Sequence, residues 1–147
     1  MIQHTRNIRF SNADINFRLK NSTRIKAVIL EIFKREKFLL HNLRYIFCSD
    51  EFLLNINRKF LQHDYYTDII TFDLSEGEGT IGEIYISIDR VKENALEFHS
   101  DFYTELLRVI FHGALHLCGY KDKTPAQEKT MRKKEEEYLL LFEELPK

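Results

Sequence analysis

The sequence is poor in the residues that dominate several non-globular protein classes. Among 147 residues there are five glycines and two prolines, which excludes collagen-like, mucin-like and linker-dominated chains. Two cysteines, Cys48 and Cys118, are too few for a disulfide scaffold. No apolar run resembles a signal peptide or reaches the length of a transmembrane helix. These absences predict a soluble, cytoplasmic chain in which residues 1–147 form a single domain.

Neither sign of charge predominates, since 22 Lys and Arg stand against 23 Asp and Glu and the formal net charge is −1. The distribution is nevertheless uneven. Residues 1–45 hold ten basic and three acidic side chains (+7), residues 46–120 hold five and 13 (−8), and residues 121–147 hold seven of each. Because the field at a surface depends on where charges cluster, the basic segment is either a phosphate-binding face or the ordinary solvent side of a helix.

Periodicity and capping signals predict strands intermixed with helices. Strands are expected within residues 2–17 and at 43–48, 69–74 and 81–88. Helices are expected at 21–33, 50–61, 87–98, 100–118 and 124–142. Asp50 is the expected cap of the second helix, and Thr124-Pro125-Ala126-Gln127 is a capping box that opens the last. The pattern predicts an α/β (α+β) fold with a single mixed sheet of about four strands packed with about five helices.

The densest group of reactive side chains lies in residues 111–122, FHGALHLCGYKD. His112 and His116 are four residues apart in an apolar helical stretch, so both imidazoles lie on one face of a long central helix. Gly119 tolerates the left-handed conformation that ends a helix, and the reversal can bring Asp122 back over the histidines. Two histidines and a carboxylate leave a coordination position for water, as in catalytic zinc sites.

Two other interpretations of this motif stay open. Histidines four residues apart can be ordinary residues at the edge of the core, with their nitrogens bonded to the backbone. Gly119 and Asp122, at the spacing of a chain reversal, favour the metal site over that alternative. A zinc peptidase shares the ligand spacing, but Gly113 stands where the His-Glu-x-x-His enzymes place their general base. Glycine cannot accept a proton, so a peptidase would need another base.

The segment HGALHLCGY, residues 112–120, resembles the signature His-Gly-x-Leu-His-Leu-x-Gly-Tyr-Asp-His of the YbeY family, metal-dependent bacterial endoribonucleases of ribosomal RNA maturation. Two further segments are similar to that family in order and spacing. They are Asn57, Asp64 and Thr67-Asp68 followed by Ile-Ile-Thr-Phe, and Gly82-Glu83-Ile84 with Ile86-Ser87. Together the three segments span residues 50–138.

The chain departs from the family pattern at two positions. Asp122 aligns with the third metal-binding histidine of the family, and a carboxylate is an acceptable zinc donor in its place. Leu61 aligns with a family arginine, which removes a phosphate-contacting cation unless Arg58 or Lys59 one turn earlier substitutes. The resemblance implies one Zn²⁺ per chain, or another divalent ion, and no organic cofactor.

The resemblance also implies a function. It predicts a single-strand-specific, metal-dependent endoribonuclease that processes the 3′ end of 16S rRNA and acts in ribosome quality control. RNA and the ribosome would be the partners, with no membrane. The implied catalytic and metal-binding residues are His112, His116 and Asp122. Thr67, Asp68 and Glu83 lie in or near the matched segments and are candidate supporting residues. The alternatives are helix capping or strand-end hydrogen bonding for the two acids and shaping of the turn for Thr67. A bound ion can polarise a phosphoryl oxygen, activate water, or both, and attack by water or by the RNA 2′-hydroxyl stays open.

The departures leave a second function class open, a largely non-catalytic assembly factor that binds RNA or the ribosome. Tyr65 and Tyr66 can stack on bases of single-stranded RNA, but with 13% aromatic residues core packing is the preferred prediction. His63 lies outside the motif and is expected at the surface. The charge run at residues 132–137, RKKEEE, is predicted to be a solvated helix face.

Overall fold

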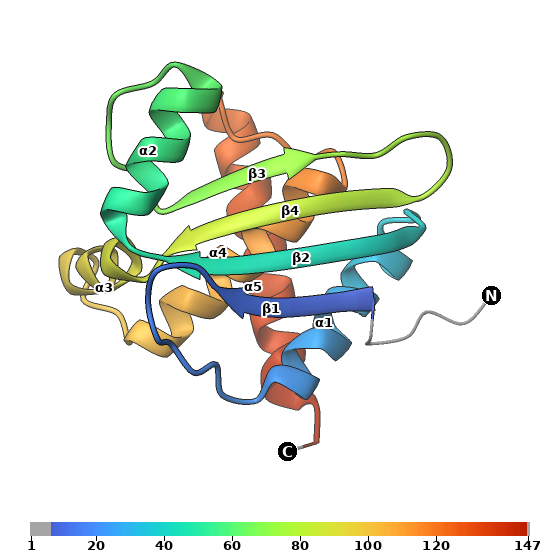
Figure 1. Cartoon of the computed structure of the whole chain (residues 1–147). Coiled ribbons are helices and arrows are strands. Elements are labelled where there is room, and N and C mark those ends of the chain that lie inside the picture. The colour runs from blue at the N-terminus through green and yellow to red at the C-terminus, as the bar shows by residue number, and fades with distance from the viewer. Residues whose placement is uncertain (1–6, 147) are drawn as a thin grey trace.

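The computed structural model of the chain describes residues 7–146, so residues 2–6 of the first expected strand region lie outside the described residues (Figure 1). The strands are β1 (Ile8–Asn12), β2 (Leu40–Cys48), β3 (Ile69–Asp73) and β4 (Thr80–Ser87). The helices are α1 (Ser22–Arg35), α2 (Asp50–Leu61), α3 (Ile88–Glu97), α4 (Phe102–Leu117) and α5 (Pro125–Glu144). Four strands in one mixed sheet and five helices over residues 7–146 confirm the predicted α+β fold. None of the helices described is both long and apolar enough to cross a bilayer.

The sheet has the strand order β1-β2-β4-β3. β1 and β4 each run parallel to β2, whereas β3 pairs antiparallel with β4. Parallel neighbours need a crossover connection, which α1 supplies between β1 and β2. The hairpin between β3 and β4 turns at residues 75–79 as expected, and Gly77 and Gly79 adopt φ values of 81° and 86° there.

Helices cover the two faces of the sheet unequally. In Figure 1, α1, α4 and α5 lie behind the sheet, and α4 packs against β3 and β4 with α1 and α5 beside it. The main core lies in this layer, where Ile84 and Phe111 are fully buried. α2 covers only one end of the opposite face, where a smaller core forms around Leu53 and Ile70. The central helix α4 therefore lies in the main core, in contact with β3, β4, α1, α3 and α5.

Glycine allows α4 to approach the sheet closely. A Cβ atom on Gly113 would lie 2.9 Å from Ile84 Cδ1, and one on Gly82 would lie 2.5 Å from Leu117 Cδ1. Carbon atoms that are not bonded pack at about 3.5–4.0 Å, so a side chain at either position would push the helix away from β4. The two glycines thus fix where α4, and with it the histidine pair, lies above the sheet.

The start of α2 differs from the prediction. Its N-cap is Ser49, whose hydroxyl accepts a hydrogen bond from the Phe52 N–H. Asp50, the predicted cap, instead accepts hydrogen bonds from Ser87 and Arg90 and ties α2 to the start of α3. Because Ser49 already satisfies the helix end, the carboxylate that follows it is free for a tertiary contact.

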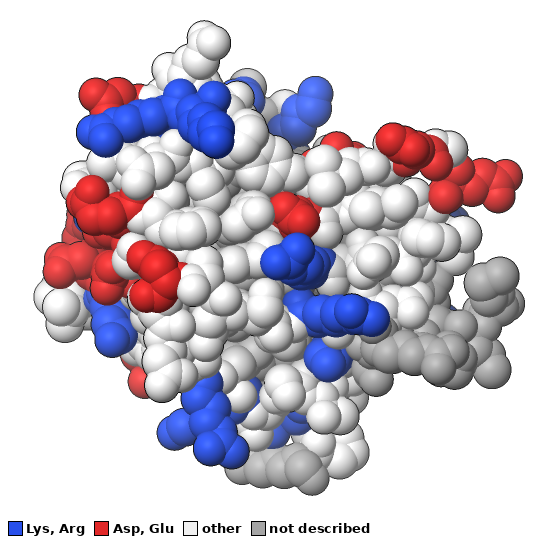
Figure 2. All heavy atoms as spheres, viewed as in Figure 1, with Lys and Arg blue, Asp and Glu red and all other residues white. Residues whose placement is uncertain are grey.

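Basic side chains do not form one continuous patch on the face that Figure 2 shows, where Lys and Arg lie in separate groups divided by uncharged surface. On the same face, acids gather near α2 and α3 and at the tip of the β3–β4 hairpin. The face that Figure 2 shows therefore offers no extended basic surface to a polyanion.

Candidate metal centre

Two histidines and an aspartate meet at the C-terminal end of α4. One ligand atom from each of His112, His116 and Asp122 lies within 4.8 Å of the others. His112 Nε2 is 3.2 Å and His116 Nε2 is 3.4 Å from the same oxygen, Asp122 Oδ2. The imidazole rings stand at 85° with centroids 4.4 Å apart. The structure therefore brings together the three residues that the spacing predicted as ligands.

The chain reversal that carries Asp122 is a glycine-terminated helix end. Gly119 has φ of 94°, and its N–H donates to the His116 carbonyl. The N–H of Tyr120 reaches back to the Leu115 carbonyl. These bonds satisfy the last carbonyls of α4 and turn the chain back toward the helix. The position of Asp122 thus follows from the conformation available at Gly119.

Hydrogen bonds on the far side of each imidazole leave Nε2 available to a metal. His112 Nδ1 lies 2.6 Å from Glu135 Oε2, and His116 Nδ1 lies 2.8 Å from the carbonyl oxygen of Tyr120. Both partners are acceptors, so in the neutral rings Nδ1 carries the proton and the lone pair stays on Nε2. Both lone pairs face the Asp122 carboxylate. Two oriented imidazoles and a carboxylate suit a divalent ion such as zinc.

Glu135, which supports His112, lies in the charge run that was expected to be solvated, and that prediction is wrong at this position. Its side chain is only 6% exposed and pairs with Arg108 at 3.4 Å. The spacing of α5 contained the signal, because Met131, Glu135 and Tyr138 share its buried stripe. An acid on the apolar stripe of an amphipathic helix needs a buried partner, and here the partners are Arg108 and His112.

Burial and neighbouring carboxylates act in opposite directions on the charge of His112. Burial opposes its protonation, but the hydrogen bond and negative charge of Glu135 more than offset burial and raise the pKa of His112 above its ordinary value. Burial raises the pKa of Asp68, although the nearby His112 works in the other direction. Burial likewise raises the pKa of Glu105. A divalent cation among these carboxylates would relieve their mutual repulsion.

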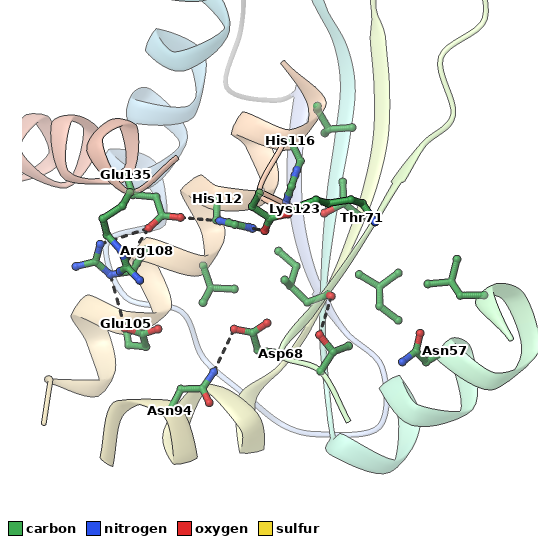
Figure 3. Close-up of a pocket in the computed structure, with 18 of the residues that line it drawn as sticks. Asn57, Asp68, Thr71, Asn94, Glu105, Arg108, His112, His116, Lys123 and Glu135 are labelled. Carbon is green, nitrogen blue, oxygen red and sulfur yellow. Dashed lines mark hydrogen bonds and ion pairs between the residues drawn. The ribbon is translucent and has the colours of Figure 1, made fainter. Parts of the chain in front are cut away.

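The three converging residues line an open cleft of about 820 Å³. Figure 3 shows Glu135, Arg108 and His112 on one side of it, Asn57 on the other side, and Asp68 between them. Its walls come from α2, the loop before β3, β3 itself, α3, α4, the turn after α4 and the middle of α5. The cleft therefore extends beyond the histidines, along β3 at the edge of the sheet.

The supporting residues expected from the sequence divide between the two faces of the sheet. Thr67 and Asp68 line the cleft. The Thr67 hydroxyl also donates to a carbonyl two residues later at 3.4 Å, which shapes the entry into β3. Glu83 lies on the opposite face, where it pairs with Arg44 at 3.5 Å. Its neighbours on β4 face α4, so strand alternation turns the Glu83 side chain away from the cleft.

Comparison with known proteins decides the family. A sequence profile of the family described as "Endoribonuclease YbeY" matches residues 7–143. A protein named "Endoribonuclease YbeY" from Cytophaga hutchinsonii is 53% identical over 133 residues, which cover 90% of this chain and 93% of that protein. The chain belongs to the YbeY endoribonuclease family. A relative of the same name from Flavobacterium psychrophilum is 48% identical over 135 residues, which cover 89% and 94%.

A solved structure shares the fold of this YbeY family member. The solution structure of TM1509 from Thermotoga maritima is similar with a TM-score of 0.64 and 33% sequence identity. The match covers 92% of this chain and 88% of that one. The family and these relatives carry the name "Endoribonuclease YbeY", so the reaction of the family is cleavage within an RNA strand.

The two departures from the YbeY pattern have different structural consequences. Asp122 stands in place of a histidine but still directs an oxygen at both Nε2 atoms. Leu61 lines the cleft without a charge, and neither Arg58 nor Lys59 is among the lining residues. Arg58 instead pairs with Asp64 at the surface. Within the described residues, the cations that line the cleft are Arg108, Lys123 and Arg132.

Proposed function

We propose that the chain is a zinc-dependent endoribonuclease that cleaves single-stranded RNA in the maturation of the 16S rRNA 3′ end and acts in ribosome quality control. Its partners are small-subunit rRNA and the ribosome, its location is the cytoplasm, and residues 1–147 act as one catalytic domain. The observation that carries the proposal is the convergence of His112, His116 and Asp122 in the cleft of a YbeY family member.

His112, His116 and Asp122 would hold the ion, which when bound polarises a phosphoryl oxygen and activates water at neutral pH. The remaining roles belong to other residues of the chain. Glu135 and the Tyr120 carbonyl hold the two imidazoles in the tautomer that directs Nε2 toward the ligand site. This support keeps the two nitrogens in place before the substrate arrives.

Asp68 is the acid proposed to move a proton. It lies on the cleft wall, where Asn94 Nδ2 donates to one of its oxygens at 3.2 Å. Burial raises its pKa, which makes the carboxylate a stronger proton acceptor than an exposed aspartate. It can take the proton from either attacking group, water or the RNA 2′-hydroxyl. Lys123 and Arg132 line the same cleft and are proposed to contact phosphate oxygens.

The peptidase alternative finds no support at Gly113. The hydrogen that takes the place of its side chain faces β4, and a Cβ there would already lie 2.9 Å from Ile84. An acid at this position would point into the sheet rather than toward the cleft. The YbeY family membership likewise favours cleavage of RNA.

Metal analysis combined with RNA cleavage tests the proposal. We expect the purified full chain to hold stoichiometric zinc and to cleave a single-stranded RNA that spans the 16S rRNA 3′ end. A chelator should abolish cleavage, and added zinc should restore it. A folded protein that is metal-free and inert toward RNA with zinc, manganese and magnesium would overturn the proposal. If such a protein still sedimented with ribosomes, the non-catalytic assembly factor would be favoured.

A further inference from the structure

An aromatic pair on the cleft wall has no part in the chemistry described above. His63 and Tyr65 follow α2, and both line the cleft. Their rings stack with centroids 5.1 Å apart at an interplanar angle of 23°, and Tyr65 Oη lies 3.0 Å from His63 Nδ1. Tyr65 is 55% exposed, so the prediction that it packs in the core is wrong. The pair instead lies on the cleft wall, where the Tyr65 ring is accessible to solvent.

The backbone that carries this pair is fixed by a buried side chain. Asn57 on α2 is only 2% exposed, and its Nδ2 donates to the Tyr65 carbonyl at 2.9 Å. The Asn57 carbonyl accepts from the His63 N–H at 3.1 Å. An ion pair between Arg58 and Asp64 ties the same loop to α2 from the outside. Because the loop is held on both sides, little freedom is lost when a flat ligand lies on the Tyr65 ring.

The adjacent Tyr66 shows that exposure alone does not make such a surface. Tyr66 is 47% exposed, close to the value for Tyr65, but it is absent from the cleft lining. Its hydroxyl donates to Glu51 at 2.6 Å, and its ring lies 5.2 Å from the guanidinium carbon of Arg90. Tyr66 is therefore engaged by α2 and α3, whereas Tyr65 is directed into the cleft.

The charge of the cleft explains why an aromatic surface would be useful to an enzyme that binds RNA. The acids that line it are Asp68, Asp73, Glu105, Asp122 and Glu135. Its three bases are outnumbered by these five acids, so a bound divalent ion would only cancel the excess. The cleft consequently lacks surplus positive charge with which to hold a polyanion. Base stacking on an aromatic ring does not depend on charge and strengthens binding by about 5- to 150-fold per base.

We propose that His63 and Tyr65 form a nucleobase subsite, in which an unpaired base of the bound RNA strand stacks on the Tyr65 ring. The proposal rests on the endoribonuclease function above and names the residues that hold the bases of its single-stranded substrate. A base inside a duplex is already stacked and paired, so the subsite selects single-stranded RNA. Every base has an aromatic face, so the subsite favours unpaired RNA of any sequence over a particular base.

A fluorescence measurement tests the subsite without any need for cleavage. The chain has no tryptophan, so Tyr65→Trp introduces a single indole at the proposed subsite. We expect saturable quenching when a single-stranded RNA oligonucleotide is added to the metal-loaded full chain. A fully paired duplex or an abasic strand of the same length should quench much less. Tyr66→Trp, one residue away and outside the cleft, is the matched control and should respond weakly to all three ligands.

A kinetic measurement tests the same proposal on the reaction. Tyr65→Ala should raise KM for single-stranded RNA by about 5- to 150-fold and leave kcat nearly unchanged, because stacking contributes to binding rather than to bond cleavage. Tyr65→Phe keeps the ring and should retain a KM near that of the wild type. An abasic RNA substrate should not distinguish the wild type from Tyr65→Ala.

The outcomes separate this proposal from the proposed function. Wild-type protein that fails to cleave any RNA contradicts the function, and the fluorescence titration still decides whether the subsite exists. Wild-type protein that cleaves RNA with an unchanged KM in Tyr65→Ala contradicts the subsite alone. Equal quenching of Tyr65→Trp and Tyr66→Trp, or bound RNA without quenching of Tyr65→Trp, overturns it as well.

Discussion

The two histidines of the metal centre lie one turn apart on α4, but different means hold them in place. His112 bonds through Nδ1 to a carboxylate on α5, 23 residues later in the chain. His116 bonds through Nδ1 to a backbone carbonyl only four residues away. The first support needs a charged side chain and the docking of a second helix, whereas the second is part of the helix end. One half of the site is therefore tertiary and the other half is local.

The support of His112 includes buried charged side chains, whereas the support of His116 is a backbone carbonyl. Glu135 and Glu105 are both buried, and Arg108 lies between them at 3.4 Å and 3.7 Å. Burial works against the charge of Arg108, but Glu136 and Glu135 more than offset it and raise the pKa of the guanidinium. The carboxylate that supports His112 thus depends on a cation from the same helix as the histidine itself.

Removing both histidines eliminates the two halves together and has the largest expected effect. Combined His112→Ala and His116→Ala substitution deletes two of three ligands, so the protein should lose its bound metal and its RNA cleavage entirely. Both side chains face the cleft rather than the core, so the far-ultraviolet circular dichroism should stay that of the wild type. Elemental analysis provides the measurement. Stoichiometric metal in this folded variant would show that the ion binds elsewhere.

Arg108→Met removes the cation that supports Glu135 and leaves the support of His116 intact. It leaves Glu135 and Glu105 buried without their shared cation, which should lower the free energy of unfolding by about 3 kcal/mol. Urea denaturation of the metal-free protein measures the loss. Arg132→Met is the matched control, because Arg132 also pairs with Glu135, at 3.6 Å, but its side chain is 63% exposed. The control should lose less than about 1 kcal/mol. Equal losses would mean that burial of the pair is unimportant.

Glu135→Gln sharpens the comparison further, because it keeps the shape of the support and removes its charge. Loss of a carboxylate that orients a ligating histidine should weaken metal binding by about 10- to 100-fold. Competition with a chromophoric chelator measures the affinity. Glu136→Gln, at the next position and exposed, removes the same charge without touching His112 and should change the affinity little. An unchanged affinity in Glu135→Gln would show that the geometry of His112 does not depend on Glu135.

The same division explains how much of the site could be predicted from the sequence. His112, His116, Gly119 and Asp122 lie within eleven consecutive residues, so helix periodicity and one left-handed residue are enough to bring them together. The position of Glu135 depends on how α5 docks on α4, which local periodicity does not specify. Its place on the apolar stripe of α5 was nevertheless visible in the spacing of the sequence.

Sequence patterns likewise do not specify on which side of the sheet an acidic side chain lies, as two residues show. Strand and helix positions followed from hydrophobic periodicity, and the mixed sheet was predicted correctly. Glu83 was expected near the site because it lies beside the matched glycine, but alternation along β4 places it on the opposite face. Which face of a strand a helix covers is decided by tertiary packing. Asp68 precedes β3 and reaches the cleft, because the loop before the strand opens on the side of α4.

The turn that supports His116 is also bonded to α1, through Tyr120 and Glu36. Removing the charge of Glu36 should have the smallest effect of the changes considered. Glu36 at the end of α1 accepts hydrogen bonds from the hydroxyls of Tyr120 at 2.7 Å and Tyr138 at 2.8 Å, and from Lys134 Nζ at 3.1 Å. Burial opposes ionisation of Glu36, but these three donors more than offset it and hold its pKa below the ordinary glutamate value. Glu36→Gln should lower the free energy of unfolding at neutral pH by about 1 kcal/mol.

The dependence of this loss on pH identifies its cause. A carboxyl group whose pKa is depressed in the folded state stabilises the protein fully above its unfolded pKa, which for glutamate is 4.5. That stabilisation is lost as the pH falls from there through the folded pKa, so the wild type and Glu36→Gln should converge in acid. Glu31→Gln, at a more exposed site on α1, should show a smaller difference at neutral pH. Metal affinity should change little in Glu36→Gln, because the Tyr120 carbonyl that supports His116 belongs to the helix end and remains. A stability difference that persists unchanged into acid would assign the role of Glu36 to packing rather than to its charge.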